Sequence, residues 1–193
     1  MKNVEFYIDL IKERLSETRF NHSIKAAEMC RELAAAHNYD PEKAYLVGIL
    51  HDICKEIGRA ELRKLALSAM LEEAWLDPVE TEESKLWHGP AGALYIRDVL
   101  EIEDKEIYSA VRFHTSGRAD MSVLEKIVYL GDIVEQSRKY PHIDMYRKCA
   151  LTDLNRGMYE ALNWTLSKNI TRDKRIARHT YEAYNFYCKK VKG

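Results

Sequence analysis

The sequence predicts an all-α fold, a compact bundle of many helices. Glycine and proline are scarce, with eight and four in 193 residues. No strand-length stretch shows the apolar and polar alternation that is typical of a half-buried β-strand. Apolar residues instead recur at helical spacing along most of the chain, which is typical of amphipathic helices packed around a core. Because there is no internal repeat or flexible linker, a single domain is expected.

Start and stop signals place the helices of the first half. The first is predicted over 21–37, where apolar residues recur at helical spacing. Asp40 is a predicted N-cap with a proline directly after it, and this second helix is expected to continue to Ile57. A weaker helix is expected over 59–76, followed by a polar connection over 77–88.

The second half carries further helix starts. A helix is expected from Gly89, and another from the cap Asp104 to a stop at Gly117. Ser122 and Glu125 have the spacing of a capping box, which predicts a third helix.

The chain ends in two longer amphipathic runs, over 143–167 and 173–192. We therefore expect one helical domain over 1–193, with a core of about 15–140 and the C-terminal helices 141–193 packed on it.

Composition argues against several classes of protein. Thirty basic and thirty-one acidic residues give a net charge of -1, so no overall positive field attracts nucleic acid. The longest apolar run, Ala44–Leu50, is far shorter than the roughly 20 residues that cross a bilayer. No membrane partner is expected.

The N-terminal segment lacks a signal peptide, so we expect a cytoplasmic protein. Its four cysteines are widely spaced and are expected to fill the core.

Six potential metal ligands interrupt the apolar pattern, namely His22, His51, Asp52, His88, His114 and Asp132. Imidazole nitrogens and carboxylate oxygens together suit divalent iron, manganese, zinc or cobalt. Any one of these residues alone is more often structural. Asp52, however, follows a strongly apolar segment, where burying an unpartnered carboxylate costs several kcal/mol. A shared ion is the favoured explanation, and a scaffold in which these residues only hydrogen-bond is the alternative.

The order and contexts of these residues resemble the HD superfamily of metal-dependent phosphohydrolases, and in particular its YqeK branch. The resemblance covers residues 1 to about 190. The contexts that carry it are Arg19-Phe20-Asn21-His22-Ser23, Leu50-His51-Asp52-Ile53-Cys54-Lys55, His88-Gly89-Pro90-Ala91-Gly92-Ala93, His114-Thr115-Ser116-Gly117 and Tyr129-Leu130-Gly131-Asp132-Ile133-Val134-Glu135. The resemblance implies an HD-type helical domain that hydrolyses symmetrical dinucleoside tetraphosphate, chiefly diadenosine tetraphosphate, to two ADP.

The resemblance also implies a metal site. The expected ligands are His22, His51, Asp52 and Asp132, with iron as the implied native ion and manganese, cobalt or zinc as alternatives. Asp52 would also orient or deprotonate the attacking water. Two roles stay open for His88 and His114: they either bind a second ion, with Asp52 as the bridge, or hydrogen-bond the scissile phosphate.

Further residues are candidates for substrate binding. Lys55 follows Asp52 by three positions, which makes it a candidate phosphate clamp and catalytic residue. The other candidates carry a cation, an imidazole or a hydroxyl in or near these motifs or in the basic C-terminal stretch. They are Arg19, His22, Thr115, Tyr129, Arg138 and Arg175.

Two departures from the family pattern stand out. Gly131 occupies a position where alanine is usual, which lowers helix propensity by about 1 kcal/mol without removing a ligand. The stretch 177–180 lacks the proline that commonly follows its histidine, which weakens the assignment of a nucleoside-contacting role to residues 172–180.

Two alternative functions are retained. One is an HD phosphodiesterase or nucleotidase that acts on another nucleotide. The other is a regulatory module that binds ADP or GDP without significant turnover. A homodimer is compatible with the twelve tyrosines, although nothing in their spacing indicates it.

Overall fold

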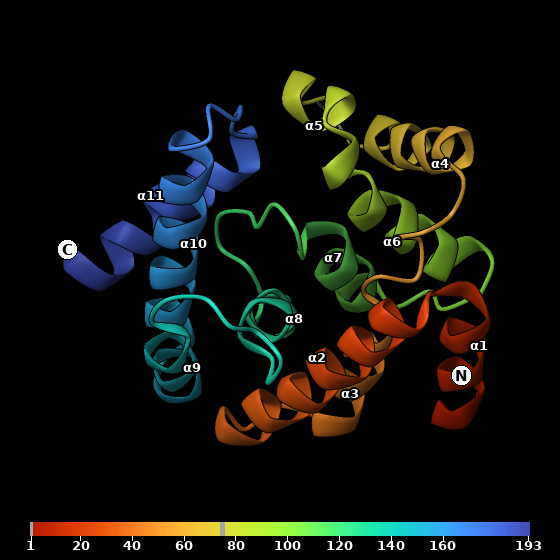
Figure 1. Ribbon diagram of the computed structural model, residues 1–193, viewed down its shortest axis with the longest axis horizontal. Coiled ribbons are helices and arrows are strands. Elements are labelled where there is room, and N and C mark those ends of the chain that lie inside the picture. Colours follow the sequence, from red (N-terminus) through yellow and green to blue (C-terminus); the bar gives the residue numbers. More distant parts are fainter. Residues whose placement is uncertain (1, 74–75) are drawn as a thin grey trace.

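The computed structural model describes residues 2–73 and 76–193, and all regular secondary structure in these ranges is helical (Figure 1). The predicted all-α fold is confirmed. The helices of the first half are α1 (Val4–Arg14), α2 (Glu17–Ala36), α3 (Pro41–Leu50), α4 (Arg59–Leu71), α5 (Pro78–Glu82), the 3-10 turn η1 (Ser84–Leu86) and α6 (His88–Asp98). Those of the second half are α7 (Lys105–Phe113), α8 (Val123–Val134), α9 (Ile143–Thr152), α10 (Leu154–Ile170) and α11 (Arg178–Lys192).

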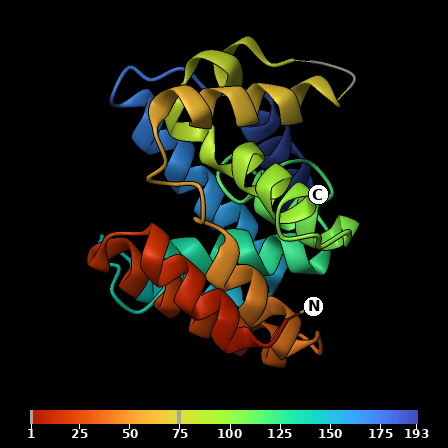
Figure 2. The ribbon, with the colours of Figure 1, turned by 90° about the vertical axis from the view of Figure 1, so that its right-hand side faces the viewer.

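The centre of the bundle is formed by α2, α3, α7 and α8, with α9–α11 on one side and α4–α6 on the other (Figure 1). α2 packs against both α3 and α8. Glycines allow these helices to pack closely. A Cβ on Gly48 of α3 would lie 2.5 Å from Ala27 Cα, and one on Gly131 of α8 would lie 2.4 Å from Cys30 Sγ. Figure 2 shows α4 and α5 at the opposite end of the molecule from α1 and α2.

Several predicted helix starts are confirmed by their caps. The Asp40 carboxylate accepts from the amides of Glu42 and Lys43 at the start of α3. Asp104 does the same at the start of α7. Ser122 and Glu125 form both bonds of the capping box at the start of α8. These caps are local in sequence, so they could be recognised without the tertiary structure.

The predicted extension of the second helix to Ile57 is wrong, because α3 ends at Leu50. His51 Nδ1 lies 2.7 Å from the carbonyl oxygen of Gly48, which would accept from the Asp52 amide if the helix continued. The imidazole thus replaces a backbone partner, and residues 51–56 form successive turns. His51 and Asp52 therefore lie in a turn rather than on a helix.

The C-terminal runs also differ from the prediction. The run 143–167 is divided at Asp153, which has an extended backbone and caps α10. The last helix begins at Arg178 rather than 173, and Asp173 has a left-handed backbone with φ 51°. An extended or left-handed residue cannot continue an α-helix. Apolar spacing alone did not reveal these interruptions.

The remaining helices show smaller differences. α1 was not predicted, and the helix expected over 21–37 begins earlier, at Glu17. The helix expected over 59–76 ends at Leu71, and residues 74–75 lie outside the described residues. The polar connection 77–88 contains α5 and η1.

The described helices and the cysteines were also the subject of expectations from the sequence. None of the described helices combines the length and the apolar character needed to span a membrane. All four cysteines are free thiols. Cys30 and Cys54 are buried as expected, whereas Cys149 and Cys188 are only half-buried.

Candidate metal centre

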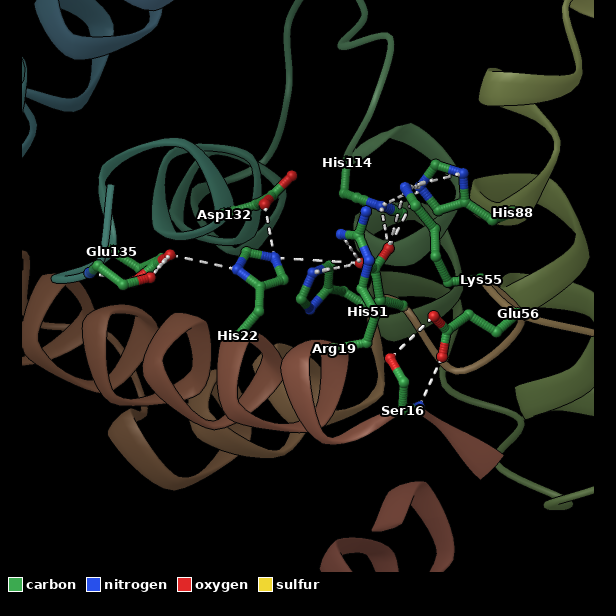
Figure 3. A network of polar contacts seen from close by, with 12 residues as sticks. Ser16, Arg19, His22, His51, Lys55, Glu56, His88, His114, Asp132 and Glu135 are labelled. Atoms are coloured by element: carbon green, nitrogen blue, oxygen red, sulfur yellow. Dashed lines mark hydrogen bonds and ion pairs between the residues drawn. The ribbon is translucent and has the colours of Figure 1, made fainter. Parts of the chain in front are cut away.

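Five separate segments bring the six potential ligands into one cluster (Figure 3). The segments are the second turn of α2, the turn after α3, the first residue of α6, the residue after α7 and the last turn of α8. They carry, in this order, His22, His51 with Asp52, His88, His114 and Asp132. Five of the six are buried, and Asp132 is half-buried.

The Asp52 carboxylate lies at the centre of the histidines. Its Oδ1 atom is 3.2 Å from His88 Nε2 and 3.6 Å from His114 Nε2. Its Oδ2 atom is 3.7 Å from His51 Nε2 and 4.0 Å from His22 Nε2. Burial disfavours the ionised carboxylate, but the surrounding imidazoles and a lysine outweigh it and hold the pKa of Asp52 well below its ordinary value.

Two overlapping groups of side chains have the spacing of a metal site. The ligand atoms of His22, His51 and Asp132 all lie within 4.8 Å of one another, and so do those of His51, Asp52 and His114. His51 belongs to both groups. Its Nε2 atom is buried and has no hydrogen-bond partner in the described part of the chain. A buried, unpartnered imidazole nitrogen facing carboxylates fits a divalent cation.

His51 and His114 are oriented in the same way. Each follows the last residue of a helix, and each Nδ1 lies 2.7 Å from the carbonyl oxygen three residues earlier, at Gly48 and Val111. The carbonyl can only accept, so Nδ1 must carry the proton and donate. In the neutral imidazole this leaves the Nε2 lone pair directed at the cluster, which is the arrangement that a metal-binding histidine requires.

The structure adds one residue that has no role among the expectations from the sequence. Glu135 lies at the end of α8 with a side chain that is 1% exposed, and its Oε1 is 3.3 Å from His22 Nδ1. Burial lowers the pKa of His22, but hydrogen bonds to Asp132 and Glu135 outweigh it and raise that pKa to about 9. Its position in the sequence could have indicated this role, since Glu135 follows Asp132 by three residues, directly after the same helix.

Three predicted phosphate-binding cations surround the cluster. Lys55 Nζ is 2.8 Å from His88 Nε2 and 3.5 Å from Asp52 Oδ1. Arg19 Nη1 is 3.5 Å from Asp52 Oδ2. Arg138 Nη2 is 2.6 Å from an oxygen of Asp132. Three separate segments of the chain thus place a positive charge next to the candidate ligands.

The other candidates occupy less direct positions. The Thr115 hydroxyl lies close to α6, since a Cβ on Gly89 would be 3.0 Å from Oγ1. Tyr129 is buried, at 1% exposure. Arg175 forms surface ion pairs with Glu82 and Glu83, and within the described residues it does not contact the cluster.

Comparisons with known proteins place these features in a family. The HD domain profile matches residues 19–136. The chain is 35% identical to a protein of Halalkalibacterium halodurans over 92% of this chain and 93% of that protein, and 30% identical to one of Bacillus subtilis over 95% and 97%. Both relatives are named symmetrical bis(5'-nucleosyl)-tetraphosphatase.

A solved structure has the same fold. It is a Clostridium acetobutylicum protein described as a predicted HD superfamily hydrolase involved in NAD metabolism. Its TM-score is 0.91 at 30% identity, and the match covers 98% of this chain and 99% of that one.

Proposed function

The chain belongs to the HD domain family of metal-dependent hydrolases, and from that premise we propose that it converts symmetrical dinucleoside tetraphosphates, chiefly diadenosine tetraphosphate, into two molecules of ADP. The observation that carries this proposal is the contact of Lys55, Arg19 and Arg138 with a buried cluster of histidines and aspartates. Such a site combines metal ligands with charges that bind phosphoryl oxygens.

His22, His51, Asp52 and Asp132 would hold a divalent metal, which we propose to be iron, with manganese, cobalt and zinc as alternatives. A divalent ion in such a site supplies Lewis-acid stabilisation of phosphoryl charge and lowers the pKa of a bound water. The four proposed ligands come from α2, the turn after α3, and α8, so the folded chain is needed to assemble the site.

Asp52 would orient the attacking water. With its pKa held low, the carboxylate stays ionised at neutral pH and accepts a hydrogen bond. The water oxygen forms a bond to an inner phosphorus, and the bridging oxygen–phosphorus bond between the second and third phosphates breaks. One ADP leaves with the bridging oxygen, the other carries the new oxygen, and the released proton passes to solvent.

His88 would donate a hydrogen bond to the phosphoryl oxygens, while Lys55, Arg19 and Arg138 neutralise charge on the phosphate chain. His114 would donate one only as an imidazolium, because its neutral ring presents the Nε2 lone pair to the cluster. The alternative is that His88 and His114 would hold a second ion, with Asp52 as a shared ligand. The grouping of His51, Asp52 and His114 supports the part of this alternative that concerns Asp52 and His114. Thr115 remains a proposed hydroxyl donor. Tyr129 and Arg175 would need a rearrangement to reach substrate.

Product identification tests the proposal. Protein reconstituted with ferrous iron or manganese is given a panel of dinucleoside polyphosphates, cyclic dinucleotides and mononucleotides. The expected result is ADP as the sole product of diadenosine tetraphosphate. AMP together with ATP would contradict the symmetrical cleavage. Turnover of another nucleotide class alone, or tight ADP binding without turnover, would support the phosphodiesterase or the regulatory alternative instead.

We also propose that the enzyme acts in the cytoplasm. Its four free thiols, two of them buried, fit a reducing compartment.

A further inference from the structure

A basic cavity adjoins the candidate metal centre. It has a volume of about 630 Å³ and lies between the exposed side of α2 and the segment that follows α8. Four cationic side chains line it, and we call them together the basic bowl: Arg19, Lys25, Arg138 and Lys139. The Glu135 carboxylate and the hydroxyl, amide and imidazole groups of α2 and of residues 137–140 complete the lining.

The positive charge of the basic bowl is only partly compensated. Glu135 is the one acidic side chain that lines it within the described residues, and it already accepts bonds from His22 and Ser137. Lys25 and Lys139 form no ion pair with any described residue. Two unpaired lysines in a hollow create a local field that favours a multiply charged anion.

The basic bowl is continuous with the candidate ligands. Arg138 lines it and also contacts Asp132 at 2.6 Å. Arg19 lines it and also contacts Asp52 at 3.5 Å. An anion held at the metal ligands could therefore extend into the bowl without crossing an uncharged surface.

The candidate metal centre has cations at two ends. In Figure 3, Lys55 and His88 lie at one end of the row of side chains, and His22 and Glu135 lie at the other. The basic bowl is at the second end, because His22 and Glu135 line it. A symmetrical tetraphosphate likewise has two equal anionic arms on either side of its central bridge.

We propose that the basic bowl binds the second nucleoside diphosphate half of the substrate, with Lys25 and Lys139 contacting its phosphates. This inference rests on the proposed function, and it names a subsite and two substrate-positioning lysines. Lys55 then serves the half at the opposite end. Recognition of both halves explains how the chain would select a four-phosphate substrate over a single nucleotide.

Binding measurements test the subsite directly. The double variant Lys25→Ala/Lys139→Ala is compared with wild type by calorimetry in the presence of Mn²⁺. The two probes are ADP and a methylene-bridged, non-hydrolysable dinucleoside tetraphosphate. We expect the Kd of the analogue to rise about tenfold, as for the loss of two charge-assisted phosphate contacts. The Kd of ADP is expected to change less than about threefold.

Lys64→Ala is the matched control, because Lys64 is an exposed lysine of α4 outside the bowl. It is expected to leave both Kd values as in wild type. Equal weakening of the two probes by the double variant, or unchanged binding of the analogue, would overturn the inference.

The proposed function can fail separately. If wild type binds the analogue but releases no ADP from the tetraphosphate, the hydrolase proposal is wrong, and the comparison of the two probes still decides the role of the basic bowl.

Discussion

Oε1 of Glu135 lies 3.3 Å from Nδ1 of His22, while Nε2 of the same ring lies 3.0 Å from Asp132. The imidazole is therefore held between two carboxylates at the C-terminal end of α8, one on each nitrogen (Figure 3). An acceptor behind a histidine ligand fixes the ring orientation and increases the basicity of the nitrogen that faces the metal. We therefore expect Glu135 to act on a bound metal through His22.

Replacing Glu135 by glutamine is expected to weaken metal binding about 10- to 100-fold, the usual effect of losing such a partner. Competition with a chromophoric chelator measures the affinity. Glu42→Gln is the control, since Glu42 is in a surface pair with Arg31, remote from the site. Wild-type affinity in Glu135→Gln would show that the contact with His22 has no role in metal binding.

Asp52→Asn is expected to abolish hydrolysis and to lower the metal content of the purified protein. The amide has the same shape but cannot supply a charged ligand between buried imidazoles. Elemental analysis gives the metal content, and circular dichroism shows whether the helices are retained. A metal content unchanged from that of wild type in a folded Asp52→Asn protein would contradict the assignment of Asp52 as a ligand, and it is the outcome expected of the scaffold interpretation.

The glycine at position 131 is explained by its partner on α2. A Cβ at Gly131 would lie 2.4 Å from Cys30 Sγ, so Gly131→Ala should destabilise the protein by about 1–3 kcal/mol through overpacking. In a Cys30→Ala background the same change should be neutral or stabilising by up to about 1 kcal/mol, because helix propensity improves.

A double-mutant cycle in urea measures this coupling. Additive effects of the two substitutions on the free energy of unfolding would mean that Cys30 and an alanine at position 131 fit together without a steric cost.

The cap at Asp104 predicts a dependence on pH. Partial burial opposes ionisation, but Lys43 and the amides of Ile107 and Glu106 hold the pKa of Asp104 below its ordinary value. Since the pKa is lowered on folding, the stabilisation is present above the unfolded value of about 3.9 and is lost as the pH falls through the folded value.

Asp104→Ala should therefore lower the free energy of unfolding by about 1 kcal/mol at pH 7. The difference in free energy of unfolding between Asp104→Ala and wild type should decrease as the pH falls below about 4. Urea unfolding at several pH values measures it. A difference that stays constant down to pH 3 would contradict the assignment to an ionised cap.

The helical class, the caps at Asp40, Asp104 and Ser122, and the six candidate ligands were all predictable from the sequence. Helix periodicity and capping depend on neighbours within a few positions, so they can be read without a structure. The identity of each candidate ligand was also visible, because histidines and aspartates stand out in apolar surroundings.

How those side chains meet was not predictable from the sequence, because it depends on contacts between distant helices. The end of α3 depends on an imidazole that takes the Gly48 carbonyl, and the role of Glu135 depends on α8 lying beside α2. The basic bowl joins α2 to residues more than a hundred positions later. Such contacts are set by which helix faces pack together, and helix spacing along one segment contains no information about its distant partner.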